Sequence, residues 1–249
     1  AHQQTFAQVA AEEFCGCKSS LSLAGCLDFK KDCKIANHLA DLVVQRVESG
    51  NNSDEILGFL ADRVLGPFCA KERALDFSAL PFKGNAEAPI TVVEFADFRC
   101  PHCKAEAPAV LATAKRFGKK VKFHFVPFPL RDHPQSVAAA EALFAAGAQG
   151  KYWAMHDELF AHQESGFDSA TLLKIAKKLR LNMKRFKNAL DKHQYKDQIA
   201  QLKQQALKVG VIGTPSFFID GRLFSPDSKV MTLARRLEME LDRNIGTCQ

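Results

Sequence analysis

The stretch from residue 90 to residue 128 limits the fold of this 249-residue chain more than any other part of the sequence. Residues 90–95 form a short, β-branched and apolar run that is typical of a buried strand. A helical stretch follows from residue 101 to about 117, and residues 121–128 indicate a second strand. Two strands joined through a helix form a β-α-β unit, which requires parallel strands and a right-handed crossover. The sequence therefore predicts an α/β fold.

A long helical insertion, at about 131–209, separates this unit from the last strands. Its apolar stripe has helical spacing and lysines on the opposite side, and it consists of Leu172, Ile175, Leu179, Met183, Phe186 and Leu190. Residues 216–224 then predict two short strands around an Asp220-Gly221 turn, and residues 227–243 predict a terminal helix.

Residues 1–75 predict a separate, small helical domain that is rich in cysteine. Apolar residues from Ile35 to Val47 fall at helical spacing until Gly50, and Ser53 is the expected N-cap of a second helix. Helices of this length are marginal alone in water. We therefore expect this domain to dock on residues 76–249 or to mediate self-association. The turn-rich stretch 81–89 marks the entry to the second domain.

The composition excludes several classes of protein and indicates a cellular compartment. Apolar residues make up 47% and charged residues 25% of the chain, which excludes a disordered tail, a collagen or a coiled-coil rod. No run of 18 uncharged apolar residues exists, so no membrane span is predicted. Eight cysteines favour an oxidising compartment, periplasmic or otherwise exported. The N-terminus has no leader features, so a signal peptide has been removed or none existed.

Residues 174–208 carry eleven Lys and Arg but only two acidic residues, a local charge of +9 within a chain of net charge +6. Their charges lie opposite an apolar stripe, and few aromatic residues accompany them for base stacking. We interpret the stretch as a solvated helix face and expect no nucleic-acid partner.

Cys100-Pro101-His102-Cys103 lies at the predicted strand-to-helix junction. Disulfide exchange needs a thiolate that is a good leaving group and a second thiol within reach. Two cysteines three residues apart at the start of a helix can form such a pair. The helix N-terminus stabilises a Cys100 thiolate, Pro101 suits the first turn, and His102 adds stabilisation if it is protonated or donates a hydrogen bond. We expect Cys100 to be the accessible thiol of low pKa and Cys103 the buried one.

Two other interpretations of this pair remain open. One is a structural disulfide, as in a non-enzymatic chaperone or adaptor. The other is half of a zinc site, but His124 and His133 are not clustered with the pair in the sequence. We expect no metal and no cofactor.

Gly213-Thr214-Pro215 precedes a predicted strand far downstream. In combination with the dithiol, we expect a cis bond before Pro215 that faces the cysteines. Thr214 would then present its backbone to an extended substrate strand.

Residues 94–103 resemble the active-site strand and helix of the DsbA family of thiol-disulfide oxidoreductases, and residues 213–221 resemble that family's cis-Pro strand. The resemblance covers roughly residues 76–245. It implies a thioredoxin-like fold with an inserted helical domain, and it implies oxidative folding of exported proteins. Substrates would be unfolded or reduced exported proteins, and a membrane protein would be the redox partner.

The resemblance also implies roles for single residues. Cys100 matches the nucleophile, Cys103 the resolving thiol, and Glu94 the buried acid that handles the proton of Cys103. The alternative for Glu94 is a strand-end residue that reaches solvent. Thr214 stands where the strong oxidases of the family carry valine, so an isomerase or reductase remains an alternative to an oxidase.

Six cysteines lie outside this motif. We expect structural disulfides among them, although a strained Cys15–Cys17 disulfide or a four-cysteine metal site is an alternative for those near the N-terminus. Their connectivity is left open; they are Cys15, Cys17, Cys26, Cys33, Cys69 and Cys248.

Overall fold

The computed structural model describes residues 3–5, 8–9, 23–24, 34–60, 64, 72–77, 79–226 and 231–241. Contacts between Cα atoms divide the chain into two compact units. One unit is Glu72–Ser225, and the other combines Ala1–Lys71 with Pro226–Gln249. The division after residue 71 lies near the expected one after residue 75. The segment from Pro226, which we had assigned to the second domain, groups instead with the N-terminal residues, because tertiary contacts rather than chain continuity define the units.

A five-stranded sheet forms the centre of the unit Glu72–Ser225, with strand order β1-β3-β2-β4-β5. Strand β2 (Ile90–Ala96) runs parallel to β3 (Val121–Pro127), so the predicted β-α-β unit is confirmed. Strands β4 (Ser216–Ile219) and β5 (Arg222–Phe224) continue the sheet antiparallel to β2 and to each other. Asp220 and Gly221 form the turn between them with positive φ angles of 47° and 78°.

The edge strand β1 (Phe82–Gly84) lies in the stretch for which the sequence predicted only turns. It pairs antiparallel with β3, where Phe82 lies opposite His124. Three residues between turn-rich flanks give little alternation of apolar and polar side chains. Pairing with β3, rather than the local sequence, therefore determines that residues 82–84 form a strand.

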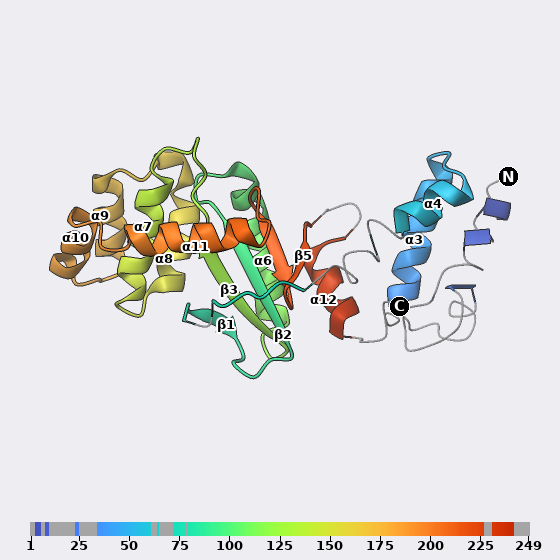
Figure 1. The fold of residues 1–249 in the computed structure, drawn as a ribbon, viewed down its shortest axis with the longest axis horizontal. Coiled ribbons are helices and arrows are strands. Elements are labelled where there is room, and N and C mark those ends of the chain that lie inside the picture. Colours follow the sequence, from blue (N-terminus) through green and yellow to red (C-terminus); the bar gives the residue numbers. More distant parts are fainter. Residues whose placement is uncertain are drawn as a thin grey trace. The chain divides into compact units, whose positions relative to one another are not determined.

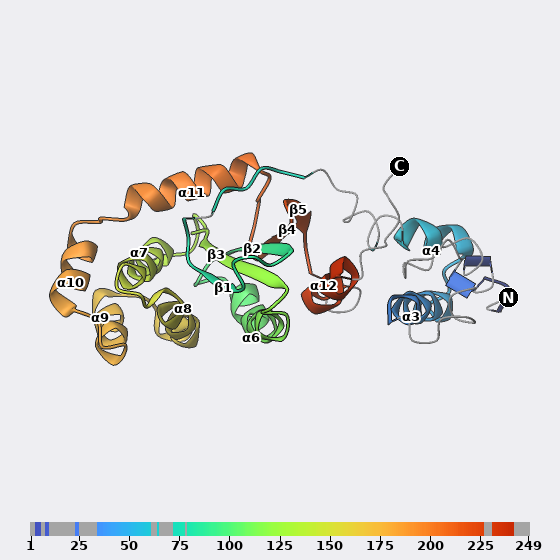
Figure 2. The ribbon, with the colours of Figure 1, turned by 90° about the horizontal axis from the view of Figure 1, so that it is seen from below.

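Helices cover both faces of the sheet, as Figures 1 and 2 show. Helix α6 (Pro101–Arg116) packs on one face, and α11 (Lys196–Lys208) runs across the other. Strand β2 is buried along nearly its whole length because both of its faces are covered. This sandwich places the N-terminus of α6 at the carboxyl end of β2.

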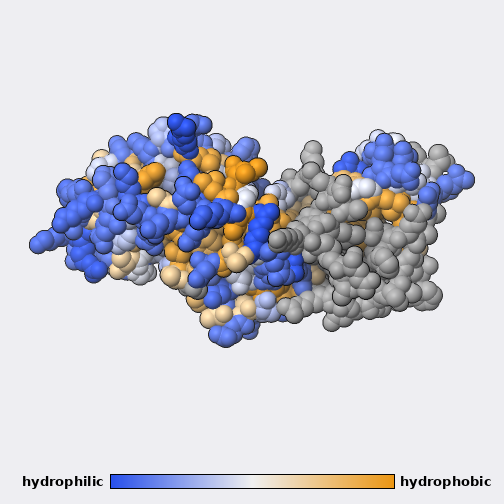
Figure 3. All heavy atoms as spheres, in the orientation of Figure 1, coloured by the Kyte–Doolittle hydropathy of each residue, from blue (hydrophilic) through white to orange (hydrophobic). Residues whose placement is uncertain are grey.

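The helical insertion between β3 and β4 has the expected position. It contains α7 (Ser136–Gly147), α8 (Tyr152–Ala161), the 3₁₀ turn η2 (Gln163–Ser165), α9 (Ser169–Lys178), α10 (Met183–Asp191) and α11. Leu172, Ile175 and Phe186 of the predicted stripe are buried, whereas lysines such as Lys174 and Lys184 are exposed. Hydrophilic side chains accordingly dominate α9 and α10 on the face shown in Figure 3.

In the other unit, the two predicted N-terminal helices are α3 (Lys34–Glu48) and α4 (Ser53–Phe59). The N-cap of α4 is Asn52 rather than Ser53. The Asn52 side chain accepts from the Glu55 backbone N–H, and the Glu55 carboxylate accepts from the Asn52 backbone N–H. Helix α12 (Leu233–Leu241) begins later than the predicted terminal helix. The six cysteines outside the motif lie outside the described residues.

Among the residues that the structure describes, no helix combines the length and the apolar character that a membrane crossing requires.

Candidate active site

The dithiol occupies the first turn of α6. Cys100 is the N-cap residue, Pro101 is the first residue of the helix, and Cys103 lies one turn inside it. The Cys100 carbonyl already accepts a helical hydrogen bond from the Lys104 N–H at 3.2 Å. Both thiols are free in the structure, so it shows the reduced dithiol.

Hydrogen-bond donors surround the Cys100 sulfur and lower its pKa to about 5. The strongest donor is the Cys103 thiol, and the Thr214 side chain and the backbone N–H groups of Cys103 and His102 add to it, against the opposing effect of burial. At pH 7 the sulfur is therefore a thiolate. The predicted accessibility of Cys100 is wrong, however, because only 3% of the residue is exposed.

The Cys103 thiol is completely buried, and burial raises its pKa. The hydrogen bond that it donates to Cys100 favours its protonated form further, whereas the backbone N–H of Asp97 acts in the opposite direction. The two thiols of one motif thus have opposite acidities. Helix position and hydrogen bonding cause this difference.

The His102 side chain is exposed, and this residue acts on Cys100 through its backbone N–H. A helix N-terminus directs its first N–H groups toward the N-cap residue, so the backbone supplies what the sequence analysis had assigned to the imidazole ring.

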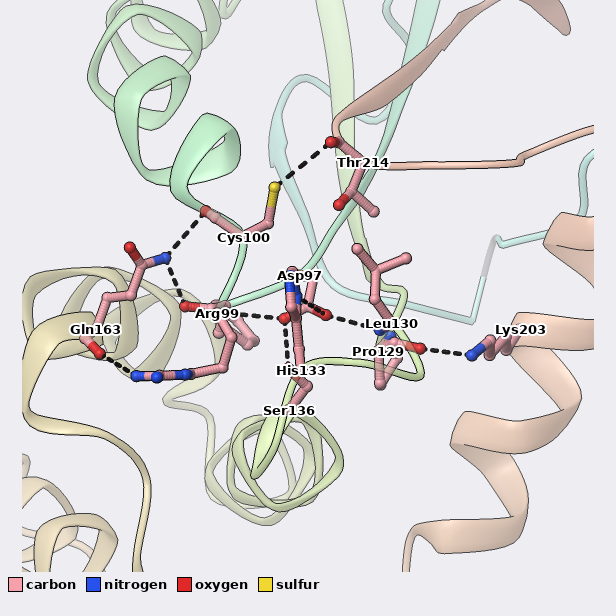
Figure 4. A network of polar contacts seen from close by, with 11 residues as sticks. Asp97, Arg99, Cys100, Pro129, Leu130, His133, Ser136, Gln163, Lys203 and Thr214 are labelled. Atoms are coloured by element: carbon pink, nitrogen blue, oxygen red, sulfur yellow. Dashed lines mark hydrogen bonds and ion pairs between the residues drawn. The ribbon is translucent and has the colours of Figure 1, made fainter.

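The loop before β4 meets the dithiol from the other side. The Thr214–Pro215 peptide bond is cis, as expected. The Cys100 sulfur lies 3.4 Å from the Thr214 carbonyl oxygen, to which it donates a hydrogen bond when it is protonated (Figure 4). The Thr214 hydroxyl is buried, and its interaction with the Cys100 sulfur lowers the pKa of that thiol. The fold therefore brings together two motifs that are 114 residues apart.

Glu94 is buried in β2 with 2% of its surface exposed, so it does not reach solvent. Burial, and to a lesser extent the charge of Glu106 on α6, raises the pKa of its carboxyl to about 8. Its Oε1 atom is buried and has no hydrogen-bond partner among the described residues. Glu94 is thus a carboxyl group on the α6 side of the sheet that holds a proton at neutral pH.

Three further residues belong to the site, and local sequence pattern does not assign them to it. Asp97 follows β2 and is buried, and both of its carboxylate oxygens accept hydrogen bonds. Gln163 in η2 donates from Nε2 to the carbonyls of Phe98 and Cys100. His133, one of the two histidines considered for zinc, binds Asp97 through Nδ1 at 2.9 Å. Asp97 could have been noticed as a polar residue at a strand end, but nothing in the local sequence distinguishes Gln163.

Comparison with known proteins places residues 79–238 in the thioredoxin family by its family model. The chain is 31% identical over 171 residues to the "probable disulfide bond formation protein D" of Bacillus anthracis, a match that covers 64% of this chain and 77% of that protein. It is also similar in structure to the thiol-disulfide exchange protein α-DsbA2 of Wolbachia pipientis. That similarity has a TM-score of 0.55 and 25% identity, and it covers 66% of this chain and 86% of the other.

A further similarity is to a segment of a larger membrane protein. Over 141 residues, the chain is 43% identical to the Na(+)/H(+) antiporter NhaA 3 of Salinispora tropica. The match covers 56% of this chain and only 21% of the antiporter, so the chain spans about a fifth of the length of that relative.

Proposed function

Because the chain belongs to the thioredoxin family, and within it to the disulfide bond formation proteins of the DsbA type, we propose that it is a thiol-disulfide oxidoreductase that introduces disulfides into exported proteins. The observation that carries the proposal is the opposite acidity of the two thiols. A low pKa at Cys100 stabilises the reduced dithiol, and a protein whose reduced form is stabilised is a strong oxidant.

The reaction starts from the oxidised protein, with a disulfide between Cys100 and Cys103. A substrate thiolate attacks the Cys100 sulfur, the Cys100–Cys103 bond breaks, and Cys103 leaves with the electron pair. A second substrate thiolate then attacks the substrate sulfur of the mixed disulfide and expels Cys100 as a thiolate. The substrate loses two electrons and gains a disulfide, and the protein is left as the reduced dithiol.

The pKa values suit the two leaving groups. Cys100 leaves as a stable thiolate, because its pKa is about 5. Cys103 has a raised pKa and needs a proton when it leaves. We assign this proton transfer to Glu94, because its carboxyl has a pKa of about 8 and lies on the face of the sheet that α6 covers.

Thr214 and Pro215 form the substrate-binding edge in this proposal. The cis bond and the 3.4 Å contact hold the Thr214 backbone next to Cys100. An extended substrate segment can pair with this backbone while its cysteine reaches the sulfur. Pro101 and His102 support the nucleophile by starting the helix.

We place the activity in the periplasm or another oxidising compartment outside the cytosol, since eight cysteines suit such a setting. Reduced exported proteins are the proposed substrates. A membrane protein that reoxidises the dithiol is the proposed partner, because each turnover leaves two electrons on the protein. For the N-terminal residues, we retain the proposal that they dock on residues 76–249 or mediate self-association.

Trapping of mixed disulfides tests the proposal. A Cys103→Ala variant cannot resolve the intermediate, so it is expected to accumulate mixed disulfides through Cys100 with many exported proteins. The matched control is Cys100→Ser combined with Cys103→Ala, which should trap none. If the Cys103→Ala variant traps no mixed disulfide, and the wild-type protein also fails to oxidise a reduced model peptide, the adaptor interpretation is favoured.

Isomerase activity is the second candidate, because Thr214 occupies the position at which the strong oxidases of the family carry valine. Oxidation of a reduced peptide and rearrangement of a scrambled disulfide protein in glutathione buffer separate the two. An oxidase is expected to be fast in the first assay and slow in the second.

A further inference from the structure

The loop from Asp97 to Cys100 carries the nucleophile, and the helical insertion holds it from two sides (Figure 4). On one side is the Asp97 carboxylate, which is completely buried. Its Oδ1 atom accepts from the Arg99 N–H at 2.7 Å and from the Ser136 hydroxyl at 2.5 Å. Its Oδ2 atom accepts from the Leu130 N–H at 2.7 Å and from His133 at 2.9 Å.

Three of these four donors, all except the Arg99 N–H, connect the loop to the start of the insertion. Ser136 is the first residue of α7, and Leu130 and His133 lie in the segment between β3 and α7. Both oxygens of Asp97 therefore have two partners each, and rotation of the side chain would break bonds to two separate elements.

Gln163 holds the same loop from the other side. Its Nε2 atom donates to the Phe98 carbonyl at 2.7 Å and to the Cys100 carbonyl at 3.0 Å. Its own backbone carbonyl accepts from the Arg99 guanidinium at 2.6 Å. Only 6% of Gln163 is exposed, so these bonds are shielded from water.

The position of this loop decides which donors the two sulfurs meet. The Asp97 carbonyl accepts from the Cys100 N–H at 3.0 Å, which fixes the backbone at the N-cap. The Cys100 sulfur depends on the backbone N–H groups of His102 and Cys103, and the Cys103 sulfur is influenced by the Asp97 backbone N–H. Such bonds weaken steeply with distance and angle. A small displacement of the loop would therefore change the acidity of both thiols.

We infer that Asp97 and Gln163 are positioning residues through which the helical insertion sets the redox properties of the Cys100–Cys103 dithiol. Neither side chain touches the sulfur atoms in this scheme. They act by holding the backbone that carries the donors. The inference rests on the proposed function, in which those redox properties are used for oxidation.

Two isosteric variants test it. Asp97→Asn places an amide N–H₂ against groups that are themselves donors, and Gln163→Glu places a carboxylate against two carbonyl oxygens. In the purified full chain, each is expected to raise the pKa of Cys100 by about 1, measured by the ultraviolet absorbance of the thiolate. The equilibrium constant with glutathione should shift about tenfold toward the oxidised protein, which corresponds to about 30 mV.

Asp168→Ala is the matched control. Asp168 is the exposed N-cap of α9 and accepts from the Thr171 N–H at 2.7 Å, far along the chain from the dithiol loop. Its loss should lower the melting temperature and leave the pKa of Cys100 and the glutathione equilibrium unchanged. Ser136→Ala, which keeps three of the four Asp97 partners, is the milder variant should an isosteric one fail to fold. It should shift both quantities in the same direction by less.

The outcomes separate this inference from the proposed function. If the variants melt earlier while their thiol pKa and glutathione equilibrium match the wild type, Asp97 and Gln163 have only a structural role and the inference is wrong. If the wild-type Cys100 itself has an ordinary thiol pKa, the proposed function fails, whatever the variants do.

Discussion

At the scale of single residues, the site depends on a few buried groups with unusual acidities. The pKa of Cys100 is lowered to about 5, and that of Glu94 is raised to about 8. Neither value follows from residue type alone. Hydrogen bonds from the Cys103 thiol and the helix N-terminus cause the first, and burial in β2 causes the second.

Alkylation tests the acidity of Cys100. In the reduced protein, iodoacetamide should label Cys100 before Cys103, and the rate should rise with pH through an inflection near 5, because only the thiolate reacts. Peptide mass spectrometry at several pH values measures both rates. In a Cys100→Ser control, labelling within the motif should be slow and show no inflection there. Faster labelling of Cys103 in the wild type would reverse the assigned roles.

Cys100 and Glu94 have opposite effects on stability between about pH 5 and 8. The folded pKa of Cys100 is lowered, so its contribution is present above the unfolded thiol pKa and is lost as pH falls toward 5. The folded pKa of Glu94 is raised, so its contribution is present below the unfolded carboxyl pKa and is lost as pH rises toward 8. In the reduced protein the two effects should nearly cancel, so the unfolding free energy should change little with pH in this range.

Single variants should reveal each slope. The unfolding free energy of reduced Glu94→Gln should rise with pH by up to about 1.4 kcal/mol per pH unit between pH 5 and 8, and that of Cys100→Ser should fall by a similar amount. The oxidised wild type should resemble Cys100→Ser, because its thiols cannot titrate. Urea titrations at three pH values measure these slopes. The same slope in both variants would contradict the assigned pKa shifts.

At the scale of elements, the site forms where the N-terminus of α6 meets the loop before β4. Helix α6 supplies unpaired N–H groups to the Cys100 sulfur, and the loop supplies the Thr214 hydroxyl as a further donor and the Thr214 carbonyl as an acceptor for the protonated thiol. Strand β4 pairs antiparallel with β2, and Phe217 lies opposite Glu94. This register places the loop that contains Thr214 next to the dithiol. The sheet thus aligns the two motifs.

A Thr214→Val variant tests the contribution of this loop. Valine keeps the shape and removes the hydroxyl, so the thiolate loses one donor and the pKa of Cys100 should rise by about 1. Thiolate absorbance against pH measures the change. Thr91→Val is the matched control, because Thr91 lies at the opposite end of β2. An unchanged pKa in Thr214→Val would show that the hydroxyl does not contribute.

At the scale of the whole molecule, the chain consists of a unit that contains the dithiol and a second unit made from both ends of the sequence. The family match at 79–238 begins inside the first unit and ends within α12, which belongs to the second. Residues 1–71 lie outside the family match.

The cysteines of that second unit provide the test at this scale. Replacing Cys15 and Cys17 together with serine should lower stability, because a disulfide in so small a unit contributes roughly 2–4 kcal/mol. Oxidation of a model peptide should remain close to wild type, since the sequence around these two cysteines does not predict a strand-to-helix junction like that of Cys100. Melting curves and peptide oxidation rates on the same samples measure both effects. Loss of turnover at an unchanged melting temperature would instead indicate a redox relay.

The sequence by itself was sufficient for the main elements that local pattern controls. An apolar, β-branched run predicted β2, and patterns along the following residues predicted α6, β3 and the helices of the insertion. Turn chemistry predicted the Asp220-Gly221 hairpin, and Pro215 in combination with the dithiol motif predicted the cis bond before it. The family resemblance predicted a buried Glu94 against the alternative of a residue that reaches solvent, and the structure buries it.

Only the tertiary structure decided the remaining features. Gln163 reaches Cys100 across 63 residues of chain, and Ser136 reaches Asp97 across 39, so no local pattern contains either contact. The same holds for the edge strand β1, which pairing with β3 stabilises. Periodicity reports which face of an element is buried. Which segment covers that face is determined only when distant parts of the chain pack together. The pKa of a buried thiol such as Cys103 depends on that packing, because burial disfavours the thiolate.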